Sequence, residues 1–459
     1  MSRSIDRRDF LALSAAGGFG LLAGTAPAQE AAAAPEKRLR HACIGVAGMM
    51  GGGDVDMFKS HPRIDIVAMC DVDENHLKNG LAKVPGARGY RDWREMLEKE
   101  GGAIDSVNVT VPDHMHAVIS LAALRKGKHV YCQKPMAHDV AGCRAMAKQA
   151  AQSGLVTQLG TQHASGIGDQ LAVHFLNKKV IGEIKRVILC SNRPGAEAYR
   201  LAGPRPAAGD AVPAQLDWNL WTGVAPERPY ANRIYHPSLW RSWQDFGTGW
   251  SGDIGCHIFS AVWKGLGFTA PRTVTAQVQE SWKNDPARRA DTWPQSNHIS
   301  WVFPGTEFTG SSDVLVEWFD GEFQPPEEFK AVARENGINQ FPPEGAMVIG
   351  SEGSLLLPHG SGPQLFPREK FREIERPQIK GPTHHHRFID ACLGGAPTES
   401  GFVAMGPMAE AILLGTVAVR TPDTVLEWDA AKLCFPNNPA ADALLRHPAR
   451  QGWEFDLGV

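Results

Sequence analysis

The stretch KHVYCQKP, residues 128–135, predicts a short buried strand that ends abruptly. Its apolar and aromatic centre is followed by a polar break that Pro135 closes. Proline donates no backbone hydrogen bond and disfavours helical geometry in its predecessor. Lys134 is therefore expected at the carboxyl end of a strand, the edge of an open α/β sheet at which ligands bind. A lysine in such a place is more often a solvated rim residue, so the surrounding sequence has to decide.

The chain from residue 39 to 160 alternates between strand-like and helix-like segments. Strands are predicted at 40–46, 63–70, 104–111, 129–132 and 155–159, and helices at 113–126 and 139–153. Such alternation is typical of a parallel sheet with right-handed crossovers. It predicts an α/β fold that begins with a doubly wound, nucleotide-binding Rossmann domain over residues 39–160.

A glycine-rich loop, residues 47–53, follows the first predicted strand and opens the first helix. Backbone amides at such a helix start bind a pyrophosphate. The fingerprint is imperfect, because Ala47 and Met50 hold two of the glycine positions counted from Gly45. Asp71 follows Gly45 by 26 residues and ends the second strand. A carboxylate there accepts hydrogen bonds from ribose hydroxyls and repels a 2′-phosphate, which favours NAD over NADP.

The loop TVPDHMH, residues 110–116, is expected at the carboxyl end of the next strand. Its side chains are therefore candidates for lining the nicotinamide end of a cofactor. Asp113 is also suited to cap the helix that follows. His116 is more often a packed helix residue than a reacting one, so both interpretations stay open for these two side chains.

Beyond residue 160, long loops rich in proline, glycine and tryptophan give way to alternating segments. Strand-like stretches lie at 272–279, 298–303, 314–318 and 347–350, and helices at 384–393 and 408–421 close the chain. They predict an α+β domain over residues 161–459 with a large, mostly antiparallel open sheet. Asp253 and His257 are four residues apart and share one face of a helix. The pair either faces a cavity or consists of a capping aspartate and a core histidine.

The composition fits two soluble domains. The 459 residues carry a net charge of −3 with mixed signs, so neither a nucleic-acid footprint nor a polybasic membrane patch is indicated. The eight cysteines show no metal spacing, and consecutive histidines at 384–386 point in different directions on a helix, so no metal site and no structural disulfide is expected. No run after the leader approaches ~18 apolar residues, so no membrane span is expected.

Residues 1–38 are interpreted as a twin-arginine signal peptide and a disordered leader. The pair in Asp6-Arg-Arg-Asp-Phe-Leu11 precedes a Gly/Ala-rich apolar run, and Ala26-Pro-Ala28 offers a cleavage site. This order predicts export by the twin-arginine machinery to the periplasm or beyond. Because the periplasm has no free NAD pool to exchange with, a dehydrogenase there has to carry a tightly bound cofactor and re-oxidise it in place.

Together these motifs resemble the Gfo/Idh/MocA oxidoreductase family, which includes glucose–fructose oxidoreductase and inositol dehydrogenase. The resemblance spans essentially all of the mature chain. It rests on the glycine loop, Asp71, the 110–116 loop, Cys132-Gln-Lys-Pro135, Gly160-Thr-Gln-His163, Asp253-x-x-x-His257 and segment 388–395. It implies a Rossmann domain and an α+β domain whose open sheet commonly forms an oligomer interface, hence a homo-oligomer.

The resemblance implies that Lys134 is the family's E-K-P lysine and that Asp253 and His257 are its D-x-x-x-H pair. Gln133 replaces the usual glutamate, and a neutral neighbour is expected to hold the Lys134 ammonium less firmly. Lys134 would relay a proton between cofactor and substrate, with His257 the leading base and Asp253 orienting it or binding a hydroxyl. The candidate cofactor contacts are Gly45, Gly48, Met49, Met50, Asp71, Thr110, Pro112, His116, Gln133 and Lys134, and the candidate substrate contacts are His163, Arg193, His236, Trp240 and Arg241.

The predicted function is NAD(P)-dependent hydride transfer between a nicotinamide and a hydroxyl of a sugar, cyclitol or related carbohydrate. Tryptophans between residues 218 and 250 suit flat walls beside a sugar. Two alternatives stay open. One is redox-neutral glycoside cleavage through a transient keto-sugar with tightly bound NAD. The other is a non-catalytic carbohydrate-binding sensor, against which the retained Lys134, Asp253 and His257 argue.

Overall fold

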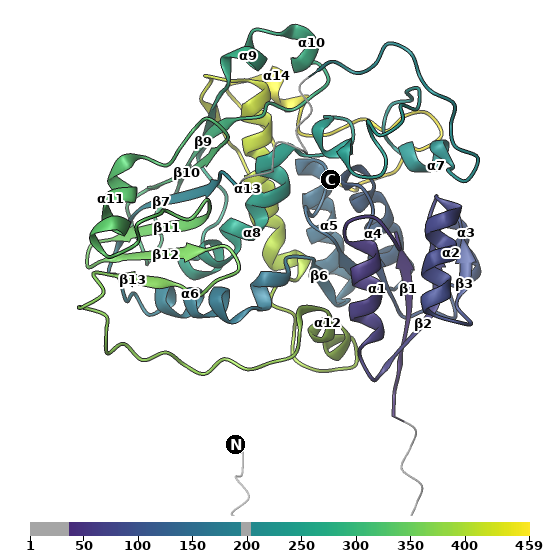
Figure 1. Ribbon diagram of the computed structural model, residues 1–459, viewed down its shortest axis with the longest axis horizontal. Helices are drawn as coiled ribbons and strands as arrows, with labels where there is room; N and C mark the ends of the chain where they lie inside the picture. Colours follow the sequence, from purple (N-terminus) through teal and green to yellow (C-terminus); the bar gives the residue numbers. More distant parts are fainter. Residues whose placement is uncertain (1–35, 194–202) are drawn as a thin grey trace, which may run out of the picture. The chain divides into compact units, whose positions relative to one another are not determined.

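The computed structural model describes residues 36–193 and 203–459 (Figure 1). The signal-peptide and cleavage-site predictions fall on residues 1–35, outside the described residues. The eight cysteines are all described; none is paired in a disulfide, and seven are buried.

Six parallel strands form the first sheet. They are β1 (Leu39–Ile44), β2 (Ile64–Cys70), β3 (Arg88–Tyr90), β4 (Ser106–Val109), β5 (His129–Cys132) and β6 (Thr157–Leu159). The strand order is β3-β2-β1-β4-β5-β6, which confirms the predicted doubly wound Rossmann sheet. The sequence prediction missed β3, because its three residues are largely exposed and carry no apolar run.

Helices connect these strands and cover the sheet (Figure 1). They are α1 (Gly51–Lys59), α2 (Glu74–Lys83), α3 (Trp93–Lys99), α4 (His116–Arg125) and α5 (Val140–Ser153). The strand order reverses between β1 and β4, so the loops that leave these two strands flank a crevice. The glycine-rich loop and the 110–116 loop are these connections, and the reversal therefore positions both at one site.

Eight strands form the second sheet. They are β7 (Ile184–Ser191), β8 (Thr273–Val278), β9 (Asn297–Phe303), β10 (Val314–Asp320), β11 (Glu344–Gly350), β12 (Ser354–Pro358), β13 (Gln364–Phe366) and β14 (Leu426–Glu427). The order is β13-β12-β11-β7-β10-β9-β8-β14, and only the β7–β10 pair is parallel. The prediction of a large, mostly antiparallel sheet is confirmed.

The helices of the second half link the two sheets. They are α6 (Ile167–Asn177), α7 (Trp218–Thr222), α8 (Gly249–Leu266), α9 (Glu280–Lys283), α10 (Pro286–Arg289), α11 (Glu327–Glu335), α12 (His384–Cys392), α13 (Phe402–Arg420) and α14 (Pro439–Asp442). The helix α8 packs on β7 and β11, and α13 packs against both α8 and α5. The helix α12 returns to the first sheet and lies beside α1 (Figure 1). The second half of the chain therefore contributes side chains to the first domain.

The helix α13 corrects a predicted boundary. It begins at Phe402 instead of 408 and contains Pro407, the residue just before the predicted start. By length and composition, one 18-residue window of this helix is apolar enough to cross a membrane, with a mean hydropathy of 1.8. In this structure 83% of that window is buried inside the protein, where α13 packs against α5 and α8.

A long connection between β7 and α8 returns to the first domain. We call its described part, residues 203–248, the roof segment. The backbone of Glu74 donates to Gln215 at 2.9 Å, and that of Asp217 donates to Val72 at 3.0 Å, so the segment is tied to the chain just after β2. Its apolar, mostly aromatic side chains form a core of their own. This core includes Leu216, Trp221, Tyr230, Tyr235, Trp240, Trp243 and Phe246, with Trp218 packed against it. Most of these tryptophans therefore stabilise the segment itself.

The close approach of β1 and β4 gives a test of the fold. Gly45 has φ +81°, and a Cβ on it would lie 2.0 Å from the carbonyl oxygen of Thr110. We expect Gly45→Ala to lower the free energy of unfolding by about 3 kcal/mol, because backbone has to move on both sides. Gly48→Ala is the matched control: φ is +69°, but no atom lies within 4 Å of the added carbon, so a loss of about 1 kcal/mol is expected. Urea denaturation measures both, and equal losses would contradict the contact.

Candidate active site

A cavity opens at the carboxyl ends of β1, β2 and β4, where the strand order reverses. Its lining includes Gly45, Gly48, Met49, Met50, Asp71, Thr110, Pro112, Gln133 and Lys134 from the first domain, and Trp221, His236, Trp240 and Arg241 from the roof segment. All the predicted cofactor contacts except His116 therefore lie on one surface. The roof segment supplies the opposite wall.

The residues of the first domain fit a dinucleotide. Gly48, Met50 and Gly51 line the cavity where α1 begins, and a helix N-terminus favours an anionic pyrophosphate. The Asp71 carboxylate accepts from the backbone N–H of Val46 at 3.1 Å and of Asp73 at 3.0 Å. These bonds hold the carboxylate at the cavity wall with lone pairs left for ribose hydroxyls. The arrangement suits NAD, because a 2′-phosphate would meet a carboxylate.

His116 does not reach the cavity. Its Nδ1 lies 2.6 Å from the carbonyl oxygen of Pro135, and its Nε2 lies 2.8 Å from that of Val111. Burial lowers the pKa of His116 to about 4. The ring braces the 110–116 loop against the segment that carries Lys134, so its role here is structural.

Lys134 meets a carboxylate from the second domain. Its Nζ donates to Asp253 Oδ1 at 3.0 Å and to the backbone oxygen of Asp253 at 3.1 Å, and Arg241 Nε lies 3.6 Å from the same Oδ1. Burial alone would raise the pKa of Asp253, but Lys134 and Arg241 lower it below its ordinary value. The carboxylate beside Lys134 is thus Asp253, so the substitution at Gln133 does not leave the ammonium without an anionic partner.

Asp113 lines this cavity, which is one of the two interpretations that the sequence left open for it, the other being a helix cap. It lies inside a 3-10 turn, Asp113–Met115, and its Oδ2 accepts from Thr248 Oγ1 at 3.2 Å. Burial, followed by the charge of Asp253, raises the pKa of Asp113 to about 8. Both causes favour the protonated form of Asp113. Its place beside a strand end and its carboxyl group were visible in the sequence, but its partner lies 135 residues away.

His257 lies one helical turn beyond Asp253 on α8, as the spacing predicted, but it is not part of the cavity lining. Its ring centroid is 5.3 Å from that of His359 and 6.2 Å from that of His163. Its Nδ1 is buried and has no hydrogen-bond partner among the described residues. Burial, and then the Lys134 charge, lower the pKa of His257 well below its ordinary value, so the imidazole is neutral.

The candidate substrate contacts divide between three places. Trp240 and Arg241 line the cavity, with the guanidinium 4.1 Å from the ring centroid. His163 is exposed and packs against His359, a residue that no motif indicated, at 4.4 Å between ring centroids. Arg193 lies over Trp250 beside Glu344.

His236 also lines the cavity, and its place as a substrate contact stays a prediction. Its Nε2 lies 3.5 Å from Asp73 Oδ2, which follows Asp71 closely in the chain. The sequence placed His236 with the substrate because it stands in the same tryptophan-rich stretch as Trp240. The roof segment folds so that the two side chains reach different ends of the cavity.

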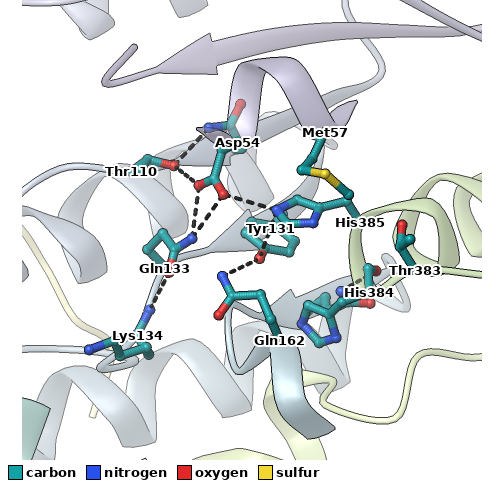
Figure 2. Close-up of polar contacts among 12 residues, drawn as sticks. Asp54, Met57, Thr110, Tyr131, Gln133, Lys134, Gln162, Thr383, His384 and His385 are labelled. Carbon is teal, nitrogen blue, oxygen red and sulfur yellow. Dashed lines mark hydrogen bonds and ion pairs between the residues drawn. The ribbon is translucent and has the colours of Figure 1, made fainter. Parts of the chain in front are cut away.

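The amide of Gln133 has a partner of its own (Figure 2). Its Nε2 donates to both oxygens of Asp54, at 2.8 and 3.1 Å, and Thr110 Oγ1 donates to Asp54 Oδ2 at 2.8 Å. His385 Nε2 lies 2.9 Å from Asp54 Oδ1. Asp54 is only 1% exposed and stands in the first turn of α1. Asp54 is thus a buried carboxylate whose partners include the amide of Gln133.

The three histidines of α12 confirm that neighbours on a helix point apart. His384 Nε2 lies 2.9 Å from the carbonyl oxygen of Leu159, and His386 Nε2 lies 2.8 Å from Ser60 Oγ. With His385 on Asp54, each ring has a separate partner in the first domain. The run fastens α12 to the Rossmann sheet.

Comparison with known proteins agrees with this architecture. Residues 39–161 match the model described as "Oxidoreductase family, NAD-binding Rossmann fold", and residues 112–293 match "Oxidoreductase family, C-terminal alpha/beta domain". The two models together span more than half of the chain. The chain belongs to the Gfo/Idh/MocA oxidoreductase family.

Curated relatives match over part of their length. Inositol 2-dehydrogenase of Salmonella typhimurium is 29% identical over 82 residues, which is 18% of this chain and 24% of that protein. The 1,5-anhydro-D-fructose reductase of Ensifer adhaerens is 30% identical over 116 residues, 24% of this chain and 33% of that protein. The chain thus spans a quarter to a third of the length of these two relatives.

Solved structures share the fold over nearly the whole molecule. The WlbA dehydrogenase from Bordetella pertussis, in complex with NADH and UDP-GlcNAcA, has a TM-score of 0.58 at 14% identity, covering 86% of this chain and 99% of that one. GenD2 from gentamicin A biosynthesis, in complex with NAD, has a TM-score of 0.55 at 20% identity, covering 90% and 100%.

The Asp54 network makes a double-mutant test possible. Gln133→Glu should lower the free energy of unfolding by about 3 kcal/mol, because a buried carboxylate would face a second carboxylate in place of an amide donor. Asp54→Asn combined with Gln133→Glu restores an amide–carboxylate pair, with the amide now at position 54 and the carboxylate at position 133. We expect this double variant to recover at least half of the loss, measured by urea denaturation at pH 7. Purely additive losses would mean that the two side chains are not coupled.

Proposed function

We propose that this protein is an NAD-dependent oxidoreductase that moves a hydride between the nicotinamide and a hydroxyl-bearing carbon of a sugar, cyclitol or related carbohydrate. The observation that carries the proposal is the Lys134–Asp253 pair at the wall of the dinucleotide cavity. The names of the relatives, inositol 2-dehydrogenase and 1,5-anhydro-D-fructose reductase, support a polyhydroxylated substrate.

The glycine loop would hold the pyrophosphate, and Asp71 would hold the adenosine ribose. When bound, NAD supplies the carbon that accepts or returns a hydride. The roof segment faces both groups across the cavity through Trp221, His236 and Arg241. Because the cofactor would lie between two walls, we infer that it leaves slowly. Slow release is what the export signal in residues 1–35 would require.

A hydroxyl that loses hydride from its carbon also loses its proton. Lys134 lines the cavity wall and is placed to take part in this proton transfer. Asp253 pairs with Lys134 and orients it, and Arg241 lies beside Asp253. We assign Lys134 as the relay, which passes one proton on as it takes the proton of the hydroxyl, and the neutral imidazole of His257, one turn beyond Asp253, as the leading base. Asp113, whose pKa is raised by burial and by Asp253, would in its protonated form donate a hydrogen bond to a substrate oxygen.

Export by the twin-arginine machinery and assembly as a homo-oligomer belong to the same proposal. The motif in residues 1–35 supports export, and the family resemblance supports an interface on the second sheet. Cell fractionation locates the protein, and light scattering of the purified chain measures its mass; a cytosolic monomer would contradict both.

The proton assignment predicts the behaviour of two variants. His257→Ala should lower kcat by about a hundredfold and leave the Kd for NAD unchanged, since the ring lies outside the cavity lining. Lys134→Ala should lower kcat at least as far. Steady-state rates and quenching of tryptophan fluorescence by NAD measure the two quantities. His386→Gln, which changes a distant ring on α12, serves as the control, and near-wild-type turnover in both test variants would remove the assignment.

The function itself is tested on the protein as purified, with its cofactor loaded. A panel of sugars, cyclitols and glycosides is added while nicotinamide absorbance and product mass are followed together. We expect at least one compound to reduce the bound nicotinamide and appear as a ketone. Release of an aglycone without net nicotinamide change would instead mean redox-neutral cleavage. Binding of carbohydrate without any chemistry would mean a sensor, and a protein that neither carries nor binds NAD would overturn the proposal.

A further inference from the structure

Near Asp71, the side chains of Asp73, His76 and His236 converge. None of the three has a role in the proton transfer proposed above. One ligand atom each from Asp73, His76 and His236 lies within 4.8 Å of the other two. Asp73 Oδ1 caps α2 by accepting from the backbone N–H of Asn75 and His76, which leaves Oδ2 directed at His236 Nε2, 3.5 Å away. The rings of His76 and His236 are 5.3 Å apart, centroid to centroid.

One carboxylate oxygen and two imidazole nitrogens are the ligand set of Zn²⁺ and neighbouring transition metals. Zinc bonds of about 2.0–2.2 Å place tetrahedral ligands about 3.4 Å apart, close to the Asp73–His236 separation. His76 and His236 both line the cavity, so a water molecule has access to a fourth position. The cluster therefore has the composition of a three-ligand site, with one ligand separation close to that of tetrahedral zinc and all three within 4.8 Å.

A neighbouring carboxylate supports the same assignment. Asp71 Oδ1 lies 3.7 Å from His76 Nδ1. A carboxylate behind a histidine is the arrangement that orients metal-bound imidazoles. The same carboxylate raises the pKa of His76, so a metal has to displace a proton there.

We propose that Asp73, His76 and His236 bind one Zn²⁺ or similar divalent transition metal ion, and that this ion fastens the roof segment to the first domain. His236 belongs to the roof segment, whereas Asp73 and His76 belong to the start of α2. The backbone bonds of Glu74 and Asp217 already join the two parts at this edge. A metal bond beside them resists the outward movement of the roof that release of a dinucleotide requires.

The metal site is tested first and by itself. The full chain, freed of metal with a chelator, is titrated with Co²⁺ near pH 8, where an ordinary imidazole is neutral. We expect one equivalent to bind with the visible absorption of tetrahedral cobalt, and Zn²⁺ to displace it. Asp73→Asn, which keeps the helix cap, and His236→Gln should each weaken binding by at least about tenfold. His174→Gln, a ring on α6, is the matched control and should bind as the wild type does.

The outcomes of this titration are distinct. Binding of less than one equivalent, or equal affinity in Asp73→Asn, His236→Gln and the wild type, would overturn the site. Thermal unfolding of each apo variant shows whether it is folded. If His236→Gln does not fold, His76→Gln on the first domain replaces it.

The fastening role rests on the NAD binding proposed above and needs its own measurement. Loaded protein is diluted into excess unlabelled NAD, and loss of labelled NAD is timed with Zn²⁺ or with chelator. We expect release at least about tenfold slower with Zn²⁺ in the wild type and no effect of Zn²⁺ in Asp73→Asn. Unchanged or faster release despite bound metal would overturn the fastening role. Absence of NAD binding would instead refute the proposed function, and the cobalt titration would still decide the site.

Discussion

The contact between Lys134 and Asp253 is the constraint on which the site depends. The two side chains are 14% and 7% exposed and come from opposite domains. A charge removed from water in this way is strongly unfavourable without its partner. The relative position of the Rossmann sheet and α8 is therefore coupled to the pairing. Burial, and then the negative charge of Asp253, raise the pKa of Asp113 and favour its protonated form.

Asp54 is a second buried carboxylate that needs partners, for the same physical reason. Its buried carboxylate is satisfied by Gln133, Thr110 and His385, which come from three separate segments (Figure 2). A glutamate at position 133 would set two buried carboxylates against each other. Gln133 instead presents an amide that donates to both oxygens of Asp54. These hydrogen bonds hold the side chain of Gln133, the residue before Lys134, in place.

The roof segment shows how an irregular stretch acquires a defined position. Its own aromatic core, with Trp218 and Trp221 stacked at 4.7 Å between centroids, holds it together. Backbone bonds to residues 72 and 74 hold it to the first domain. With these anchors, one loop reaches the ribose end of the cavity with His236 and the lysine end with Arg241. A single segment can therefore influence both cofactor retention and substrate orientation.

The amino-acid sequence by itself determined the order of elements, the doubly wound sheet and the place of Lys134 at a strand end, because those features follow from local periodicity and from proline and glycine chemistry. It also placed Asp253 and His257 on one helical face. Only the tertiary structure decided that Asp253 reaches Lys134 while His257 does not line the cavity, and that His116 is a brace. Pairings such as Asp54 with Gln133, or His236 with Asp73, join residues 79 and more than 150 positions apart. No local pattern encodes them, since they depend on how the two sheets and the roof segment pack.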